Sequence, residues 1–381
     1  MTIDNNENKL LNLMKRVQEE QNRKADYIVP ANHMQKRTIE DSDGKMKPQL
    51  IVEQRGGEPT LVMDFNDVSF NQYAVYNGIE SRTARRLQDQ APSEFDALLN
   101  RLHSQDSNKR MLRTFDNGSS STLRANLSDK FKTFDNYDFL EASIPALLDR
   151  TEEAPEIMQA DYTEKRMYMR FKFNAQTGEG ANVGDLMANG IGFSNSETGH
   201  GSIAVWQNFW TLACTNGMQT DNRSRSAHIT SARESDVYGV LSQEAKDADN
   251  KAMALKLRDL VKSYSSRESF DEVLQKMRLA GADVAEDIEP VELANNAGRV
   301  LALTKQETSG LLNGLISTIG QAGYERDKPL TRATLINAVT ACQHKAEKDD
   351  VDLWQRRGGQ VLNMRASDWS RIKEKKEKAV A

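Results

Sequence analysis

A β-hairpin is predicted near the middle of the chain by the stretch 110-RMLRTFDNGSSSTLRANLS-128. Its two ends suit extended structure, and the Asp-Asn-Gly-Ser segment between them is typical of a turn. Another strand is predicted by 167-MYMRFKF-173, in which Met and Phe alternate strictly with Tyr, Arg and Lys. Two more extended segments follow at 189–196 and 201–209. Together these segments indicate an antiparallel sheet in the middle of the chain.

Helical patterns lie on both sides of these strands. Helices are predicted over 67–79, 81–103, 135–148 and 207–218, and Gly217 ends the last of them. Beyond residue 236, four apolar stripes predict further helices, and these stripes contain Leu257, Phe270, Leu311 and Leu335. The predicted fold class is α+β, with a central antiparallel β-sheet and packed helices, followed by a mainly α-helical C-terminal region.

The chain is predicted to have three regions. Residues 1–60 form an N-terminal arm that is partly flexible: 1–26 suits one amphipathic helix, whereas Pro and Gly interrupt 27–59 and leave a loop with at most one short strand at 49–54. A disordered tail and an ordered arm both fit this region. Residues 61–235 form an α+β core domain, and residues 236–381 form the helical C-terminal region.

Composition excludes several classes of protein. The 381 residues carry 51 Lys and Arg against 56 Asp and Glu, so a basic field over the whole chain is excluded, although a local basic patch is not. Two cysteines, Cys214 and Cys342, are too few for a disulfide framework and indicate free thiols. The polar start and the lack of a long apolar run predict no signal peptide and no membrane span. We therefore expect a cytoplasmic protein.

Sequence signals of enzymes are missing. No phosphate-binding loop occurs, and the spacing of Gly178, Gly180 and Gly184 does not match a dinucleotide fingerprint. The five histidines are scattered, and neither a zinc-ligand pattern nor a nucleophile elbow is present. We therefore expect no catalytic residues, no bound metal and no cofactor.

The strongest candidate site is a basic surface with aromatic side chains. Segment 109–133 holds six basic residues and only two acidic ones. Single-stranded nucleic acid is held by positively charged grooves in which bases stack on aromatic rings. The alternative is an ordinary solvated face of an antiparallel sheet. The predicted nucleic-acid-binding residues are Lys109, Arg110, Arg113, Arg124, Lys130, Lys132, Tyr168, Arg170, Lys172, Arg223 and Arg225.

Several blocks of the sequence resemble one family. Residues 124–136 fit R-x-x-L-S-D-x-[YF]-x-x-x-D-N, residues 194–202 fit S-N-S-E-x-G-x-G-S, residues 214–218 read C-T-N-G-M, and residues 331–340 fit T-x-x-x-L-x-N-A-V-T. These blocks are similar to the phage/plasmid-like protein family, a domain of unknown function (number nine hundred and thirty-two). The likeness extends over about 61–372. It implies a phage, prophage or plasmid origin but supplies no activity and no catalytic residues.

The order of the predicted elements is also similar to the core of single-strand annealing recombinases. That second likeness implies binding of single strands in a basic groove, assembly into rings or filaments, and no need for ATP. It is an analogy at the level of fold alone.

Three hypotheses follow. The first is an ATP-independent single-stranded-DNA-binding protein of a phage or mobile element, acting in annealing, recombination or replication in the bacterial cytoplasm. It would be a homo-oligomer with a phage or host replication or recombination protein as partner. The second is a non-enzymatic interaction or structural module, for self-assembly or host-factor binding. The third is an enzyme that uses Asp129, Asp135, Glu197 and His200 around a hard cation.

Overall fold

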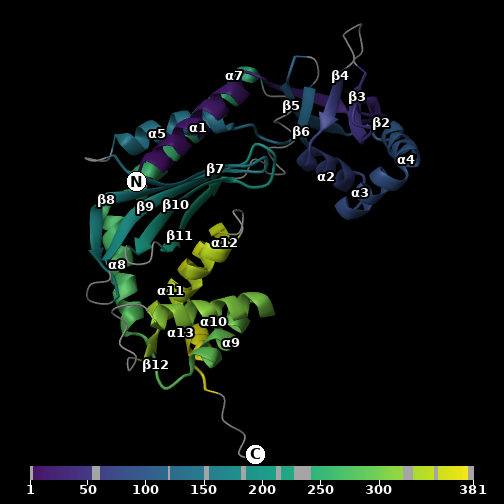
Figure 1. Ribbon diagram of the computed structural model, residues 1–381. Coiled ribbons are helices and arrows are strands. Elements are labelled where there is room, and N and C mark those ends of the chain that lie inside the picture. Colours follow the sequence, from purple (N-terminus) through teal and green to yellow (C-terminus); the bar gives the residue numbers. More distant parts are fainter. Residues whose placement is uncertain are drawn as a thin grey trace, which may run out of the picture.

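Two large sheets organise the chain. The computed structural model describes residues 3–53, 61–118, 121–149, 154–181, 186–211, 216–226, 242–320, 329–346 and 351–375. Figure 1 shows an arch, in which a curved five-stranded sheet joins a lobe containing a six-stranded sheet to a lobe of helices. This arrangement confirms the α+β class, including the helical C-terminal region.

The six-stranded sheet has the order β1-β5-β6-β4-β3-β2, and only β4 and β6 run parallel. Its strands are β1 (Lys24–Pro30), β2 (Met34–Glu40), β3 (Met46–Val52), β4 (Leu61–Phe65), β5 (Lys109–Asp116) and β6 (Ser121–Ser128). Strands β5 and β6 form the predicted hairpin. Helices α2 (Asp67–Tyr76), α3 (Ser81–Gln90) and α4 (Pro92–Ser104) lie beside this sheet (Figure 1). Phe70 of α2 and Phe95 and Leu99 of α4 enter the core of the lobe.

The five-stranded sheet is an antiparallel meander with the order β11-β10-β9-β8-β7. Its strands are β7 (Glu156–Tyr162), β8 (Met167–Glu179), β9 (Leu186–Asn195), β10 (Ile203–Thr211) and β11 (Asn216–Ser226). On its outer face, Met169 and Phe171 of β8 pack against α1 (Ile3–Gln21), α5 (Asn136–Leu148) and α7 (Gln243–Tyr264), which Figure 1 shows side by side. The alternation in 167–173 therefore predicts correctly which side chains share a face.

The inner face of the same sheet is buried as well. Tyr168, Arg170 and Trp206 lie there and are at most 3 % exposed. Helix α12 (Val351–Leu362) packs against β11 on this side, and its Asp352 accepts a hydrogen bond from Gln219 at 2.7 Å. A helix on each side makes this part of the sheet a middle layer.

The C-terminal region folds around a core of its own. It contains α8 (Arg267–Ala282), β12 (Val284–Ala285), α9 (Pro290–Val300), α10 (Lys305–Ile319), β13 (Leu330–Thr331), α11 (Arg332–Ala341) and α13 (Ala366–Ile372). Phe270, Leu311 and Leu335, which belong to predicted apolar stripes, are fully buried in it. Within the described residues, no helix combines the length and the apolar character needed to cross a membrane.

The N-terminal segment is more ordered than predicted. Leu13 and Val17 of α1 are buried in the core between the outer face of the five-stranded sheet and its helices, which agrees with an amphipathic helix. The prediction of a loop with at most one short strand over 27–59 is wrong where the chain is described, because β1, β2 and β3 supply half of the six-stranded sheet. The strand predicted at 49–54 corresponds to the second half of β3. Residues 54–60 lie outside the described part. The segment therefore belongs to the same sheet as the hairpin.

The predicted helix over 207–218 is also wrong. Residues 207–211 continue β10, and β11 begins at Asn216, while Cys214 and its neighbours lie outside the described residues. Every residue of β10 is buried, so this strand lacks the polar alternation that marks a half-exposed strand. Apolar runs buried on both faces do not distinguish a strand from a helix.

We expect Gly192→Ala to destabilise the fold by about 1–3 kcal/mol, because a small-to-large change in a packed interior forces side chains to move. A Cβ atom at Gly192 would overlap the indole ring of Trp206, which is fully buried. The free energy of unfolding from urea denaturation measures the effect.

Gly310→Ala is the matched control. A Cβ atom at Gly310, on α10, meets nothing within 4 Å, so removal of a helical glycine is expected to stabilise the protein by about 0.5–1 kcal/mol. Equal effects of the two substitutions would contradict the assigned packing of Trp206 on Gly192.

Candidate functional site

The eleven residues predicted to bind nucleic acid are divided between two sheets. Lys109, Arg110 and Arg113 lie on β5 and Arg124 on β6, and Lys130 and Lys132 follow β6. Tyr168, Arg170 and Lys172 lie on β8, whereas Arg223 and Arg225 lie on β11, where their side chains are outside the described part. The structure therefore separates these residues into groups with different surroundings.

Four of them are interior. Arg113, Arg124, Tyr168 and Arg170 are at most 3 % exposed. The three arginines are each within ion-pair distance of a carboxylate, because a buried guanidinium needs a compensating charge. Contrary to the prediction, these four side chains do not line an exposed groove.

Two of the lysines are also engaged by carboxylates. Lys132 pairs with Asp249 at 2.9 Å, and Lys172 pairs with Glu156 at 2.6 Å. Lys109 and Lys130 are exposed, and Arg110 is half-buried. Arg110 opposes Ser128 in the hairpin register, so Lys109, Arg110 and Lys130 gather at one end of the hairpin.

A buried cluster of charges joins the two sheets. We call it the charge cluster; its members are Lys24, Asp26, Arg113, Arg124, Asp135 and Glu197. Nη2 of Arg113 lies 2.7 Å from Asp135 and 2.9 Å from Asp26. The ammonium of Lys24 lies 2.6 Å from Glu197 and 3.2 Å from Asp135. Three cations thus meet three carboxylates.

Local structure brings these charges together. Asp26 on β1 stands directly opposite Arg113 on β5, so their pairing follows from strand register. Asp135 is the N-cap residue of α5, and the next residue, Asn136, donates its backbone N–H to Glu197 at 2.7 Å. Glu197 lies in the turn between β9 and β10. The charge cluster therefore ties the six-stranded sheet to α5 and to the far end of the five-stranded sheet.

The two sequence blocks 124–136 and 194–202 contact each other at this point. The side-chain amide of Asn195 donates to the carbonyl oxygen of Phe134 at 2.9 Å and to the side-chain oxygen of Asn136 at 3.0 Å. Gly199 has φ +75°, a backbone conformation that glycine adopts without strain. Two of the four blocks that carry the family resemblance thus form one structural unit.

Cations of the charge cluster lower the pKa of its carboxyl groups. Burial by itself would raise the pKa of Asp135, but Arg113, Lys24 and Arg124 together hold it well below its usual value. The pKa of Glu197 is lowered as well, because the same three cations outweigh burial and the charge of Asp135. Both carboxylates therefore remain charged in the folded protein at neutral pH.

An open depression of about 600 Å³ lies beside Arg110, between the hairpin and the β9–β10 turn. Its wall contains a tyrosine, two cations and several amides, and among the described residues no carboxylate lines it. The lining residues are Asn71, Gln72, Val75, Tyr76, Ser81, Arg110, Asn126, Leu127, Ser128, Lys165 and His200. This mixture of groups suits a ligand with both negative charge and flat rings.

Arg110 and Tyr76 form the most ordered part of the depression. The Arg110 guanidinium lies 4.1 Å from the centre of the Tyr76 ring and donates to the side-chain and backbone oxygens of Asn126 at 3.0 Å each. The hydroxyl of Tyr76 donates to Asp106, and burial together with this bond raises the pKa of Tyr76 to about 12. The phenol is therefore neutral, and the ring position is fixed.

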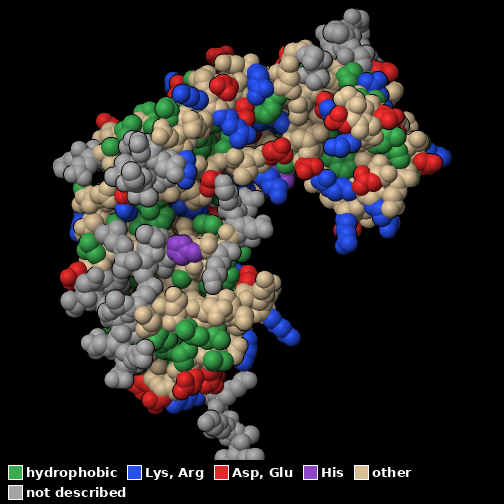
Figure 2. Space-filling view, viewed as in Figure 1, with side chains coloured by type: hydrophobic (Ala, Val, Ile, Leu, Met, Phe, Trp, Pro, Cys, Tyr) green, Lys and Arg blue, Asp and Glu red, His purple; other side chains and the backbone are tan. Residues whose placement is uncertain are grey.

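Helix α2, which contributes Asn71, Gln72 and Tyr76 to the depression, lies on the side of the upper lobe that faces the hollow of the arch (Figure 1). Figure 2 shows Lys and Arg side chains reaching into this hollow from the upper lobe, from the inner wall and from the helical lobe. Helix α3 lies at the edge of the upper lobe (Figure 1), and its Arg82, Arg85 and Arg86 are exposed. Arg85 is bound to Asp67 at 3.1 Å. Cations are thus distributed along the hollow on both sides of the depression.

The residues weighed for an enzyme do not form one site. Asp135 and Glu197 are held in the charge cluster, whereas His200 lines the depression. Within the described ranges, no group of three or more His, Cys, Asp or Glu side chains could hold a metal ion.

Sequence reasoning missed several residues of these sites. Lys24 and Asp26 lie in a segment predicted to be an arm, and Lys165 and Tyr76 were not singled out. Lys165 occupies the short β7–β8 turn, next to the predicted strand 167–173. The strict alternation of that strand predicted where the strand begins, but nothing in the sequence showed that the turn before it, which carries Lys165, lies against the hairpin.

Comparison with known proteins gave no match to any family model, curated protein or solved structure. The resemblance to the phage/plasmid-like family and the analogy to annealing recombinases remain predictions.

We expect Asp135→Asn to lower the free energy of unfolding by about 1–3 kcal/mol, because Arg113 loses one of its two carboxylate partners and keeps Asp26. Urea denaturation at pH 7 measures this loss. Glu164→Gln removes an exposed carboxylate of the β7–β8 turn and is expected to change stability by less than about 0.5 kcal/mol.

The charge cluster also predicts that the free energy of unfolding falls in acid. Asp135 and Glu197 have lower pKa values in the folded protein than the ordinary values of 3.8 and 4.5. The unfolded chain therefore binds protons first as the pH falls, so the stabilisation is complete above about pH 5 and is lost progressively below it. Unfolding curves between pH 3 and pH 7 test this, and the slope below pH 5 should be smaller in Asp135→Asn.

Proposed function

We propose that this protein binds single-stranded DNA in the hollow of the arch, without ATP. The observation that carries the proposal is the depression at Arg110 and Tyr76, with cations and an aromatic ring in its wall and no carboxylate among its described lining residues. Phosphates attract Lys and Arg regardless of base sequence, and bases stack on aromatic faces. The depression offers both kinds of contact.

The cations around the depression favour binding of a nucleic-acid strand rather than of an isolated nucleotide. Arg82 on α3 follows Ser81, which lines the depression, and Arg86 is exposed one turn further along the helix. Lys109 and Lys130 lie at the hairpin end that carries Arg110. A chain of phosphates could contact these cations in succession. A local positive surface of this kind attracts nucleic acid even though the net charge of the chain is −5.

The wider role is part of the same proposal. The motif blocks resembling the phage/plasmid-like family favour a mobile element as the source, and the bacterial cytoplasm as the place of action. Strand annealing, recombination or replication would be the process, with homo-oligomers as the active form and a phage or host replication or recombination protein as a partner. Leu98 and Leu102, exposed one turn apart on α4, offer an apolar surface for self-association.

We expect a double variant, Arg82→Ala with Lys165→Ala, to bind a fluorescently labelled single-stranded oligonucleotide more weakly than the wild type. Each lost phosphate contact should reduce the slope of log affinity against log salt concentration by about 1. Fluorescence anisotropy at several salt concentrations measures both quantities. Both side chains are exposed, so the fold should not change.

The matched control removes the same charge from the outer face, by Lys256→Ala with Arg258→Ala on α7. This variant should bind as the wild type does. Equal losses in the two double variants would indicate non-specific attraction, and no binding by the wild type at low salt would refute the proposal. A preference for duplex over single strand would refute the assigned substrate.

A further inference from the structure

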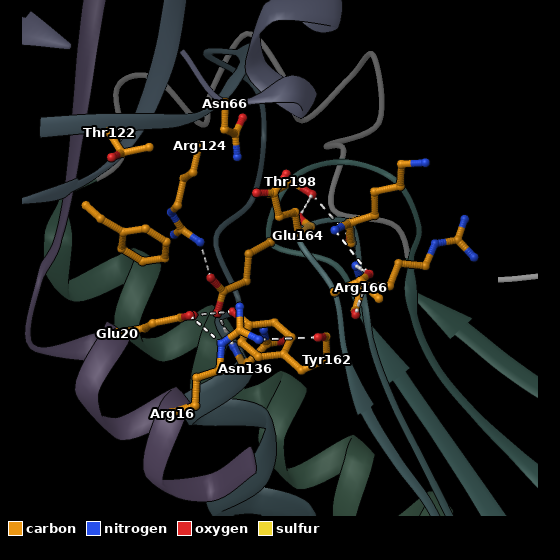
Figure 3. A pocket seen from close by; sticks show the side chains of 14 residues that line it. Arg16, Glu20, Asn66, Thr122, Arg124, Asn136, Tyr162, Glu164, Arg166 and Thr198 are labelled. Carbon is orange, nitrogen blue, oxygen red and sulfur yellow. Dashed lines mark hydrogen bonds and ion pairs between the residues drawn. The ribbon is translucent and has the colours of Figure 1, made fainter. Parts of the chain in front are cut away.

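A second pocket, of about 120 Å³, borders the charge cluster on the side of α1 and β7. Figure 3 shows Arg124 extending into it from β6, with Thr122 above and with Arg16, Glu20 and Tyr162 below. The pocket is separate from the depression at Arg110, although Lys165 contributes to both walls.

One edge of the Arg124 guanidinium has no hydrogen-bond partner among the residues that the structure describes. Its Nη1 donates to Glu197, but Nε and Nη2 are buried and meet no acceptor among the described residues. Arg124 as a whole is 3 % exposed. Nε and Nη2 form the side edge of a guanidinium, where two N–H groups point the same way and match two oxygens of one anion. Leaving two such donors unsatisfied in the interior is costly.

The position of this edge is fixed by its neighbours. The guanidinium carbon of Arg124 lies 4.8 Å from the centre of the Phe115 ring, and Phe115 stands opposite Thr122 in the hairpin register. The ion pair with Glu197 holds the opposite side of the group. The two free donors are therefore held in a preorganised orientation.

Two of the three carboxylates of the pocket wall are bound by other groups. Glu20 is bound by Arg16 at 2.9 Å and accepts the hydroxyl hydrogen of Tyr162. Glu197 is bound by Lys24, by Arg124 and by the backbone N–H of Asn136. Neither of these two carboxylates accepts a hydrogen bond from Nε or Nη2 of Arg124.

The charge of the pocket favours an anion. Four cations line it, namely Arg16, Arg124, Lys165 and Arg166, against the carboxylates of Glu20, Glu164 and Glu197. Glu164 is exposed, as are Arg16 and Lys165, so solvent screens the charges of all three. The pocket is larger than the share of about 30 Å³ that one water molecule takes in the liquid.

We propose that this pocket binds a small oxyanion, a phosphoryl or carboxylate group, on the Nε and Nη2 donors of Arg124. The two oxygens accept one hydrogen bond each, while Nη1 keeps its bond to Glu197. The site does not depend on the depression, and it would exist even if the protein bound no nucleic acid.

Isothermal titration calorimetry of the full chain with inorganic phosphate, and separately with acetate, tests the site. Thr122→Phe should weaken binding at least about tenfold, because Thr122 shares the pocket-facing side of β6 with Arg124 and a larger ring fills the space. Asn117→Ala is the matched control: it removes the hydrogen bond that Asn117 donates to Thr122 at 2.9 Å but leaves the pocket open, so affinity should be unchanged.

Arg124→Lys gives an independent reading if Thr122→Phe does not fold, as judged by circular dichroism. Lysine keeps the charge beside Glu197 but lacks the paired donors, so phosphate should bind at least about tenfold more weakly. No heat of binding with either anion would mean that water alone satisfies Arg124, and it would overturn the proposal. Wild-type affinity in whichever of the two variants folds would overturn it too.

If phosphate binds, its source can be distinguished by comparing oligonucleotides with a 5′-phosphate and a 5′-hydroxyl group. Tighter binding of the phosphorylated strand, lost in Thr122→Phe, would assign the pocket to strand ends. Equal binding of the two strands would assign it to a free small molecule.

Discussion

The arrangement of the two sheets depends on the charge cluster around Arg113. This arginine is fully enclosed, and its partners come from β1, from the start of α5 and from the β9–β10 turn. A buried ion network adds little net stability compared with apolar packing, but its geometry tolerates few alternatives, because each charge requires its own partner. The charge cluster therefore acts mainly on specificity: it determines how the six-stranded sheet sits against the end of the five-stranded sheet. We call this contact between the two sheets, made by the charge cluster, the joint. Apolar cores lie on both sides of the joint and stabilise each sheet separately.

Both candidate sites lie at this joint, so their shapes depend on it. The depression takes Tyr76 and Arg110 from the lobe of the six-stranded sheet and Lys165 and His200 from turns of the five-stranded sheet. Gln72 spans the same boundary, since its side chain donates to the carbonyl oxygen of Thr198 at 2.6 Å and accepts from the backbone N–H of Asn126 at 2.9 Å. The pocket at Arg124 also has walls from both sheets, with Arg124 on β6 and Tyr162 on β7. Loss of the joint would separate the walls without changing any residue within them.

Part of this structure follows from the sequence. The hairpin, the faces of strand 167–173 and the C-terminal helices are visible as local patterns, because each has a regular period and clear ends. Strands β1 and β2 are not visible in this way, and β3 is visible only as the short strand predicted at 49–54, because Pro and Gly interrupt the segment. Lys36 of β2 is buried where it pairs with Asp96 of α4. The burial of the arginines cannot be recognised in the sequence either. Arg113 meets Asp26 and Asp135 at separations of 87 and 22 residues, and no local pattern shows such contacts. The sequence therefore predicted basic side chains on the correct strands and could not separate structural cations from exposed ones.

The distinction between buried and exposed cations determines where the surface of the protein is positively charged. The arginines in the interior are neutralised by carboxylates, so they contribute little to the field outside, whereas the exposed cations of α3, the hairpin end and the β7–β8 turn lie around one hollow. Arg124 belongs to both groups: one side holds Glu197 in the joint, and the other faces a pocket. An anion bound at that second side would add its binding free energy to the folded arrangement, because the pocket takes its walls from both sheets and exists only when the two are in place. Occupation of the pocket would therefore stabilise the same joint that shapes the hollow.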